Sequence, residues 1–172
     1  MIEPAWLDWA VGEWRADVRE VPGPEHHPRI LEYFRLCGAD WVTDDETPWC
    51  AAAVGAALVS TLPGIVLPRG PLRARSYLAW GERMVAEASR PGALAVFSRG
   101  AGAQPGPEVI DAPGHIAILL ASASSEVFVL GANQGDAWSI RAYPHSRLLG
   151  LRWPPPGAEP GPRYRIREGG PR

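Results

Sequence analysis

Cys50, His115 and Asn133 are the residues whose types and order could together perform nucleophilic chemistry. A cysteine nucleophile needs a base within hydrogen-bond reach, and the base needs a third group that holds its ring in the required tautomer. His115 is the candidate base because it follows Gly114 and opens an apolar stretch that predicts a strand. Asn133 is the candidate for orienting that ring, and a turn-forming asparagine is the competing interpretation.

Cys50 lies in the segment TDDETPWCAAAVGAAL (residues 43–58), which predicts a helix that begins at Pro48 with Thr47 as its N-cap. The positive end of the helix dipole then lies beside the thiol and favours the thiolate, which is the nucleophilic form. The alternative is that Cys50 is a small core residue, as most free cysteines are. Because residues 51–57 carry little side-chain bulk, we expect this helix at the centre of the domain.

Side chains close to the candidate triad form a predicted substrate-binding set. Asp45 and Glu46 precede the nucleophile, and we interpret them mainly as a turn that complements the helix dipole, with recognition of a substrate ammonium group as the alternative. Ser98 and Arg99 are candidates for meeting a substrate carboxylate, since arginine binds carboxylates in a bidentate fork. Two residues adjacent to the triad complete the set: Trp49 and Gln134.

Neither a metal nor an organic cofactor is expected. His26 and His27 are adjacent, so they do not face one site, and no third ligand stands nearby in the sequence; a surface or capping role is the favoured interpretation. Cys37 lies on the apolar stripe of a predicted helix and is assigned to the core. The glycine-rich stretch 100–106 does not sit between a strand and a helix, so it is not interpreted as a phosphate-binding loop.

The elements that must position these residues come as helices followed by strands. Apolar spacing predicts helices at residues 4–17, 28–37, 48–61 and 73–80. Apolar runs bounded by Gly, Pro and Ser predict strands at 93–97, 115–120, 126–130, 138–143 and 148–153, with a loop at 100–113. This order predicts one α+β domain over residues 1–153, with N-terminal helices packed on an antiparallel meander. Residues 154–172, rich in Pro, Gly and Arg, predict an extended or disordered tail.

Composition limits the classes of function. A chain of 172 residues with 46% hydrophobic side chains can bury a single core. The 17 Lys and Arg against 19 Asp and Glu include no basic block, which argues against nucleic-acid binding. The first residues carry neither a basic segment nor a continuous apolar one, so we expect no signal peptide, no membrane span and synthesis in the cytoplasm. We also expect the protein to be a monomer. The eight tryptophans are assigned mainly to the core, with a sugar-binding surface as the alternative.

Seven sequence blocks between Trp6 and Pro154 resemble the cysteine peptidoglycan hydrolases related to NlpC/P60 and CHAP domains, which occur in phage lysins and bacterial proteins. The blocks follow the order of that family, and PWC, FSRG and GHIAI are their most specific parts. They are PGPEHHPRILEYF (22–34), DETPWC (45–50), LRARSYLAWG (72–81), RPGALAVFSRG (90–100), GHIAILL (114–120), VLGANQ (129–134) and YPHSRLLGLRWP (143–154).

The resemblance implies a papain-like fold of the NlpC/P60 or CHAP type and a cysteine peptidase or amidase that needs no cofactor. Its substrate would be an amide bond in the stem peptides of bacterial peptidoglycan. By position, Cys50 matches the nucleophile, His115 the base and Asn133 the residue that orients the base. The protein would reach the cell wall from the cytoplasm as a phage endolysin released through a holin, or as an effector exported by a secretion system.

Two other hypotheses remain open at the level of sequence. A thiol acyltransferase would use the same three residues and pass the acyl group to an amine instead of water. A non-catalytic module would keep the scaffold and use its tryptophans to contact a glycan or a protein. The sequence also leaves open which bond a hydrolase would cleave: the lactyl–L-alanine bond, the bond between D-glutamate and the diamino acid, or a cross-bridge.

Overall fold

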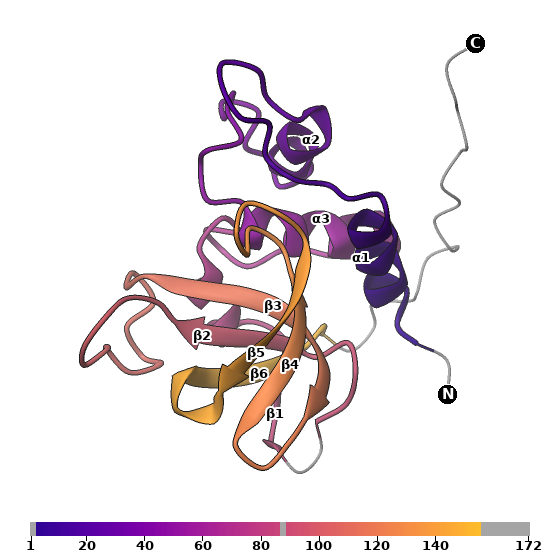
Figure 1. The fold of residues 1–172 in the computed structure, drawn as a ribbon. Helices are drawn as coiled ribbons and strands as arrows, with labels where there is room; N and C mark the ends of the chain where they lie inside the picture. The colour runs from indigo at the N-terminus through magenta and orange to yellow at the C-terminus, as the bar shows by residue number, and fades with distance from the viewer. Residues whose placement is uncertain (1–2, 87–88, 156–172) are drawn as a thin grey trace.

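The computed structural model of the protein describes residues 3–86 and 89–155. Most of the predicted tail, residues 156–172, lies outside this part of the chain. Three α-helices and a 3-10 helix come first along the described part of the chain, as predicted (Figure 1). They are α1 (Ala5–Arg15), α2 (Pro28–Leu36), α3 (Cys50–Thr61) and the 3-10 helix η1 (Ala74–Ala79).

The strands of the described residues form one antiparallel sheet. They are β1 (Glu82–Met84), β2 (Leu94–Ser98), β3 (Gly114–Ser122), β4 (Glu126–Gly131), β5 (Ser139–Pro144) and β6 (Leu148–Trp153), arranged in the order β1-β6-β2-β3-β4-β5. Strands β2 to β5 make the predicted meander. After the short 3-10 helix η3 (His145–Arg147), β6 returns to the other edge of β2, so the sheet is more than a simple meander. The predicted α+β class is confirmed.

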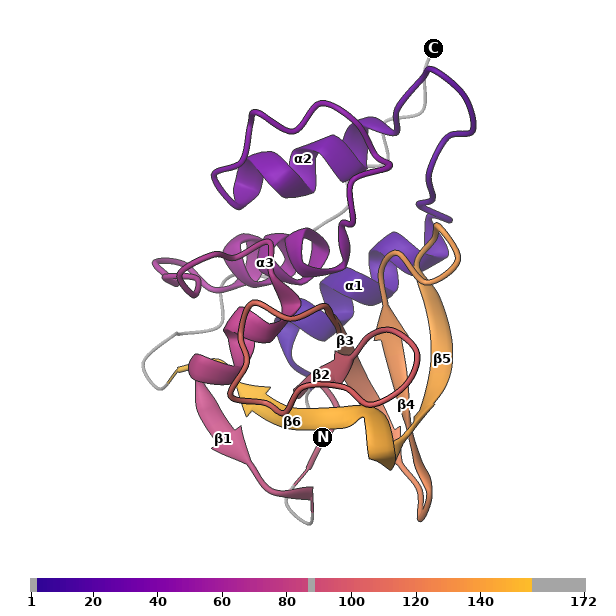
Figure 2. The same cartoon turned by 90° about the vertical axis from the view of Figure 1, so that its left-hand side faces the viewer.

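Helix α3 lies between α2 and the sheet (Figures 1 and 2), the central place expected from its small side chains. Every residue from 50 to 58 is buried. A Cβ added at Gly55 would lie 2.5 Å from Cys37 Sγ, and the Cys37 thiol donates to the carbonyl of Ala52 at 3.4 Å. The lack of side-chain bulk on α3 therefore lets the end of α2 pack against its backbone.

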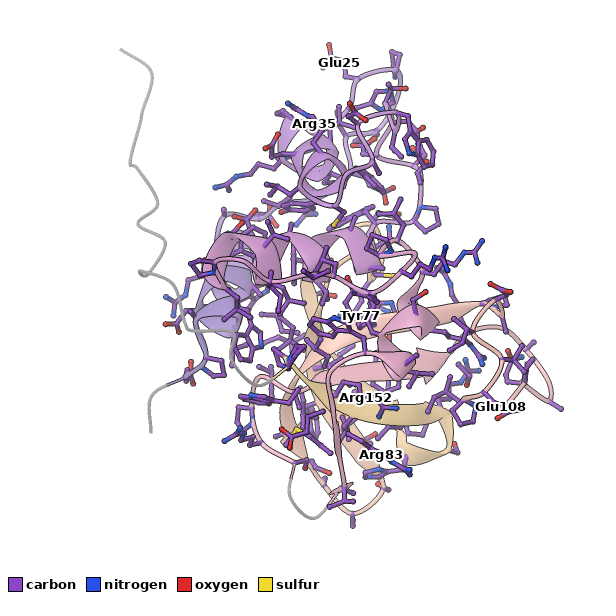
Figure 3. All side chains as sticks on the ribbon, turned by 180° about the vertical axis from the view of Figure 1, so that it is seen from behind. Glu25, Arg35, Tyr77, Arg83, Glu108 and Arg152 are labelled. Carbon is purple, nitrogen blue, oxygen red and sulfur yellow. The ribbon has the colours of Figure 1, made fainter. Side chains whose placement is uncertain are left out.

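Tyr77 of η1 supports α3 from the opposite side. Its ring is fully buried and lies between α3 and the sheet (Figure 3). The Tyr77 hydroxyl lies 3.3 Å from the carbonyl of Pro71 and 3.5 Å from that of Ala51. The first turn of α3 is consequently held in a fixed position above the sheet.

Three local features differ from the sequence-based expectations. Helix α3 begins at Cys50 with Trp49 as N-cap, because the N–H and hydroxyl of Thr47 both bind Asp44 Oδ1, at 2.7 and 2.9 Å. Thr47 thus closes a turn and does not cap the helix. The predicted fourth helix is the 3-10 helix η1. Strand β1 was not predicted because its three residues, Glu82, Arg83 and Met84, carry no apolar alternation.

The centre of the sheet, formed by β2 and the first half of β3, is buried on both faces. Side chains that alternate along β2 and β3 pack either on the helices or in a second core on the other face. The second core contains Ala93, Ala95, Phe97, Ala117, Leu119, Val127, Val129 and Leu151. This double burial explains why β2 and the first half of β3 are continuous apolar runs rather than alternating ones.

Candidate active site

Cys50, the first residue of α3, lies at the edge of β3. The N–H of Leu119 donates to Ala93 O on the β2 side at 2.7 Å. Successive N–H groups of a strand point to opposite neighbours, so the N–H of Ile116 points toward the β4 side. Strand β4 pairs with β3 only from Ile118 onward and does not reach Ile116. The N–H of Ile116 lies close enough to the sulfur of Cys50 to lower the pKa of the thiol. The sulfur of Cys50 therefore lies on the side of β3 where β4 provides no hydrogen-bond partner for Ile116.

Burial favours the neutral form of the Cys50 thiol. The residue is only 4% exposed. Burial raises the pKa of Cys50, and the opposing effects of the Ile116 N–H, the Arg99 guanidinium and the first N–H groups of α3 do not cancel it. The expectation of a resting thiolate at the helix start is therefore corrected, because loss of solvent outweighs the helix dipole. A neutral thiol needs a base before it can attack a carbonyl.

His115 is held by Gln134. Its Nε2 lies 3.1 Å from Gln134 Oε1. The amide nitrogen of Gln134 is already engaged, since it donates to the carbonyls of Ser139 (2.6 Å) and Gly131 (3.2 Å). The oxygen of the amide must then face the imidazole, so Nε2 of His115 carries the hydrogen. Nδ1 is left unprotonated, as a general base requires.

The imidazole of His115 is neutral as well. Burial lowers the pKa of His115 to about 4, against the bond from Gln134, which raises it, while the charges of Arg99 and Arg141 lower it further. Two aromatic rings provide much of this burial. The imidazole centroid lies 5.6 Å from that of Tyr143 and 6.3 Å from that of Phe97, at interplanar angles of 30° and 25°. Burial therefore favours the neutral form of both the Cys50 thiol and the His115 imidazole.

Asn133 does not hold His115. Its Nδ2 donates to Glu20 Oε1 at 2.6 Å, and the same oxygen accepts the indole N–H of Trp49 at 2.8 Å. The backbone φ of Asn133 is 55°, in the left-handed region that asparagine adopts more readily than most residues. The turn-forming interpretation describes Asn133 as it lies in the structure, and the contact that we expected from it is made by Gln134.

Asp45 does not offer its carboxylate to a substrate ammonium group, which was the alternative interpretation of this residue. It is fully buried and accepts bonds from the N–H groups of Val21 (3.0 Å) and His27 (2.9 Å) and from the ring of His26 (2.9 Å). Burial acts to raise the pKa of Asp45, but these bonds lower it overall. Asp45 therefore fixes the loop before α2, whereas Glu46 is exposed.

Of three other residues predicted to contact a substrate, two are buried and one is exposed. Trp49 is fully buried, with its indole N–H bound to Glu20, and Ser98 is buried with its hydroxyl 3.4 Å from Arg147 O. Both belong to the framework of the site. Arg99 is exposed and remains available to a substrate.

The adjacent histidines of the N-terminal loop have structural roles. His26 binds Asp45, and Nδ1 of His27 accepts the N–H of Arg29 at 3.2 Å, at the start of α2. The capping role predicted for this pair is confirmed for His27.

Sequence reasoning missed Tyr143, Arg141 and Glu20. The first two face the same side of β5, which period-two alternation could have revealed once the strand was identified. Arg141 also donates from Nη2 to the backbone carbonyl of Gln134 at 3.2 Å. No local pattern indicates Glu20, whose pKa is raised by burial, lowered by its bond to Trp49, and raised again by neighbouring carboxylates.

Residues 3–86 and 89–155 contain no group of three or more His, Cys, Asp or Glu side chains placed to hold a metal ion. Over the same residues, none of the helices combines the length and the apolar character needed to cross a bilayer.

The fold and the site define a class of protein: an α+β domain in which a helix that begins at a buried cysteine packs on an antiparallel sheet, and the sheet carries a histidine held by a glutamine. No known protein-family model matches the chain, and no curated protein is significantly similar to it.

Proposed function

We propose that the protein is a cysteine hydrolase that cleaves an amide bond in the stem peptides of bacterial peptidoglycan. The observation that supports this proposal most strongly is the fixed tautomer of His115. Gln134 binds its Nε2–H and leaves Nδ1 as a base, and the next residue, Ile116, has the N–H that lowers the pKa of Cys50. A core histidine satisfied by a backbone carbonyl would not require this arrangement. The order of helix-borne cysteine, strand-borne histidine and a following amide residue supports a papain-like arrangement.

The proposed reaction begins from the neutral pair. As Cys50 attacks the scissile carbonyl, its proton passes to Nδ1 of His115 and a bond forms between sulfur and carbon. The resulting imidazolium donates that proton to the leaving nitrogen, the C–N bond breaks, and an amine departs. Water, deprotonated by His115, then attacks the thioester; the S–C bond breaks, the acid is released, and the proton returns to the thiol.

The start of α3 supplies groups for the oxyanion of this reaction. The N-cap residue makes no side-chain hydrogen bond, and the N–H groups of Cys50 and Ala51 lie close enough to the sulfur of Cys50 to lower its pKa, so they are candidates for binding the oxyanion. One such donor contributes about 3 kcal/mol to lowering the barrier. The helix dipole adds to the stabilisation of negative charge at this end.

The choice of peptidoglycan rests on the sequence blocks around Cys50, His115 and Gln134, which resemble cell-wall hydrolases. This substrate lies outside the cytoplasmic membrane, so the protein would act after holin-dependent or secretion-dependent release. Glu46 and Arg99 are exposed and have the charges that a zwitterionic stem peptide would need.

Digestion of purified peptidoglycan tests the proposal. We expect the wild type to release new amino groups and Cys50→Ala to release none, with both proteins checked for the same thermal unfolding. Mass spectrometry of the muropeptides identifies the cleaved bond. Equal release by the two proteins would refute the nucleophile, and a product that incorporates an added amine would indicate acyl transfer instead of hydrolysis.

A further inference from the structure

The face of the sheet that carries His115 also carries two arginines. Cross-strand partners share a face, and His115 pairs with Phe97 while Arg141 pairs with Val129; both partners belong to the second core. His115 and Arg141 therefore project on the same side. Arg99 follows Phe97 by two positions and continues this side beyond the end of β2.

Electrostatic effects agree with this placement. The positive charge of Arg99 lowers the pKa of Cys50, and the charges of both Arg99 and Arg141 lower that of His115. The two guanidinium groups approach the reacting pair from different strands, one after β2 and one on β5. A ligand that reaches His115 therefore lies within the field of both charges.

These guanidinium groups retain free hydrogen-bond donors. Both residues are exposed, and in the described part of the chain the arginines that form ion pairs are others. Arg141 uses Nη2 to bind the carbonyl of Gln134, which anchors the side chain and leaves its other donors available. An anchored, solvent-facing guanidinium near His115 is suited to binding a carboxylate.

We infer that Arg99 and Arg141 form a carboxylate-binding subsite, so that the preferred substrate carries a free carboxylate next to the scissile amide and its amidated form is a poorer substrate. This inference rests on the proposed function, because it takes Cys50 as the attacking group. It adds a specificity determinant, Arg141, and a class of substrate: anionic peptides whose charge lies close to the cleaved bond.

Alkylation of Cys50 tests the subsite without any knowledge of the natural substrate. Iodoacetate and iodoacetamide both react with the thiolate, which displaces iodide and forms a C–S bond. Iodoacetate carries a carboxylate, and iodoacetamide carries a neutral amide in its place. Because both rate constants are proportional to the fraction of Cys50 that is ionised, their ratio does not depend on that fraction. Mass spectrometry of proteolytic peptides separates Cys50 from Cys37, the pKa of which burial raises to about 12.

We expect the iodoacetate-to-iodoacetamide ratio at Cys50 to exceed that of free cysteine. It should fall about threefold in Arg99→Gln and again in Arg141→Gln, the effect of one charge at about 6 Å in water. Arg141→Lys should keep most of the ratio, and high salt should reduce it in the wild type. Arg83→Gln, an exposed arginine on β1 at the far edge of the sheet, is the matched control and should change nothing.

A ratio that stays the same in Arg99→Gln and Arg141→Gln, with alkylation by iodoacetamide intact, would overturn the subsite and leave the nucleophile standing. Failure of both reagents to alkylate Cys50 in the folded wild type would overturn the subsite and the proposed nucleophile together. A ratio that falls in both variants, but not in Arg83→Gln, supports the inference.

Discussion

Replacing Gln134 by leucine removes the group that holds the His115 ring while keeping a side chain of similar size. In the wild type, Oε1 of Gln134 accepts the Nε2–H of His115, and the amide nitrogen binds two backbone carbonyls. Leucine offers none of these bonds. The imidazole can then rotate or change tautomer, and the hydrogen bond that stabilises the imidazolium during the reaction is lost.

The expected magnitude follows from the charge that develops on His115. A hydrogen bond to a charged group contributes about 1.5 to 3 kcal/mol. Because about 1.4 kcal/mol corresponds to a factor of ten, we expect kcat/KM to fall by roughly 10-fold to 100-fold in Gln134→Leu. The bond to Gln134 raises the pKa of His115, so the acid limb of the pH–rate profile should move to lower pH in this variant.

Asn133→Gly provides the matched control, since glycine adopts the positive φ of this position without strain. It removes the contact with Glu20 and leaves Gln134 in place, so we expect less than a threefold loss of kcat/KM on peptidoglycan fragments. If Asn133→Gly loses as much activity as Gln134→Leu while remaining folded, the assignment of the orienting role to Gln134 is wrong.

Three further predictions concern the environment of the site and the packing of α3. Burial holds the pKa of His115 near 4 against 6.5 for the free group, so between pH 6.5 and 4 the unfolded chain binds a proton that the native protein does not. The free energy of unfolding should therefore fall as the pH decreases through this window, by at most about 3 kcal/mol, and urea titrations should show a weaker dependence in His115→Gln. Tyr143→Ala exposes the imidazole and should raise the pKa of His115 toward 6.5 in an NMR titration, whereas Tyr143→Phe should not; an unchanged pKa in the alanine variant would contradict the role of stacking. Gly55→Ala places a Cβ 2.5 Å from Cys37 Sγ and should lower the free energy of unfolding by about 1 to 3 kcal/mol. Adding Cys37→Ala should restore much of this loss, and a neutral Gly55→Ala would show that the packing described for α2 and α3 is wrong.

The central helix and the core strands could be predicted because their residues leave few alternatives. A run of alanine, valine and glycine at residues 51–57 is apolar on every side, so a helix made from it must be covered all round. The run from Ala93 to Phe97 is too short for a helix of this kind and has a Pro-Gly entry. Both predictions depend only on local composition.

The remaining features depend on contacts between distant parts of the chain. The pairing of β6 with β2 joins segments about fifty residues apart, and nothing in the sequence of either strand specifies that partner. Asn133 and Gln134 are adjacent amides, and the sequence does not show that Gln134, which follows the positive φ of Asn133, is the one that faces His115. The sequence also could not predict the direction of the pKa shift of Cys50. Burial raises this pKa and the helix start lowers it, and only the three-dimensional surroundings show which effect is larger.

The central claim is that Cys50 attacks an amide carbonyl with His115 as its base. Intact-protein mass spectrometry, after acid quench during turnover of solubilised stem peptides, tests this claim most directly. We expect an acyl adduct that maps to the Cys50 peptide, is absent in Cys50→Ala, and has the mass of the substrate less that of the departing amine. Amine release without any adduct on Cys50, continuing at the same rate in Cys50→Ala, would contradict it.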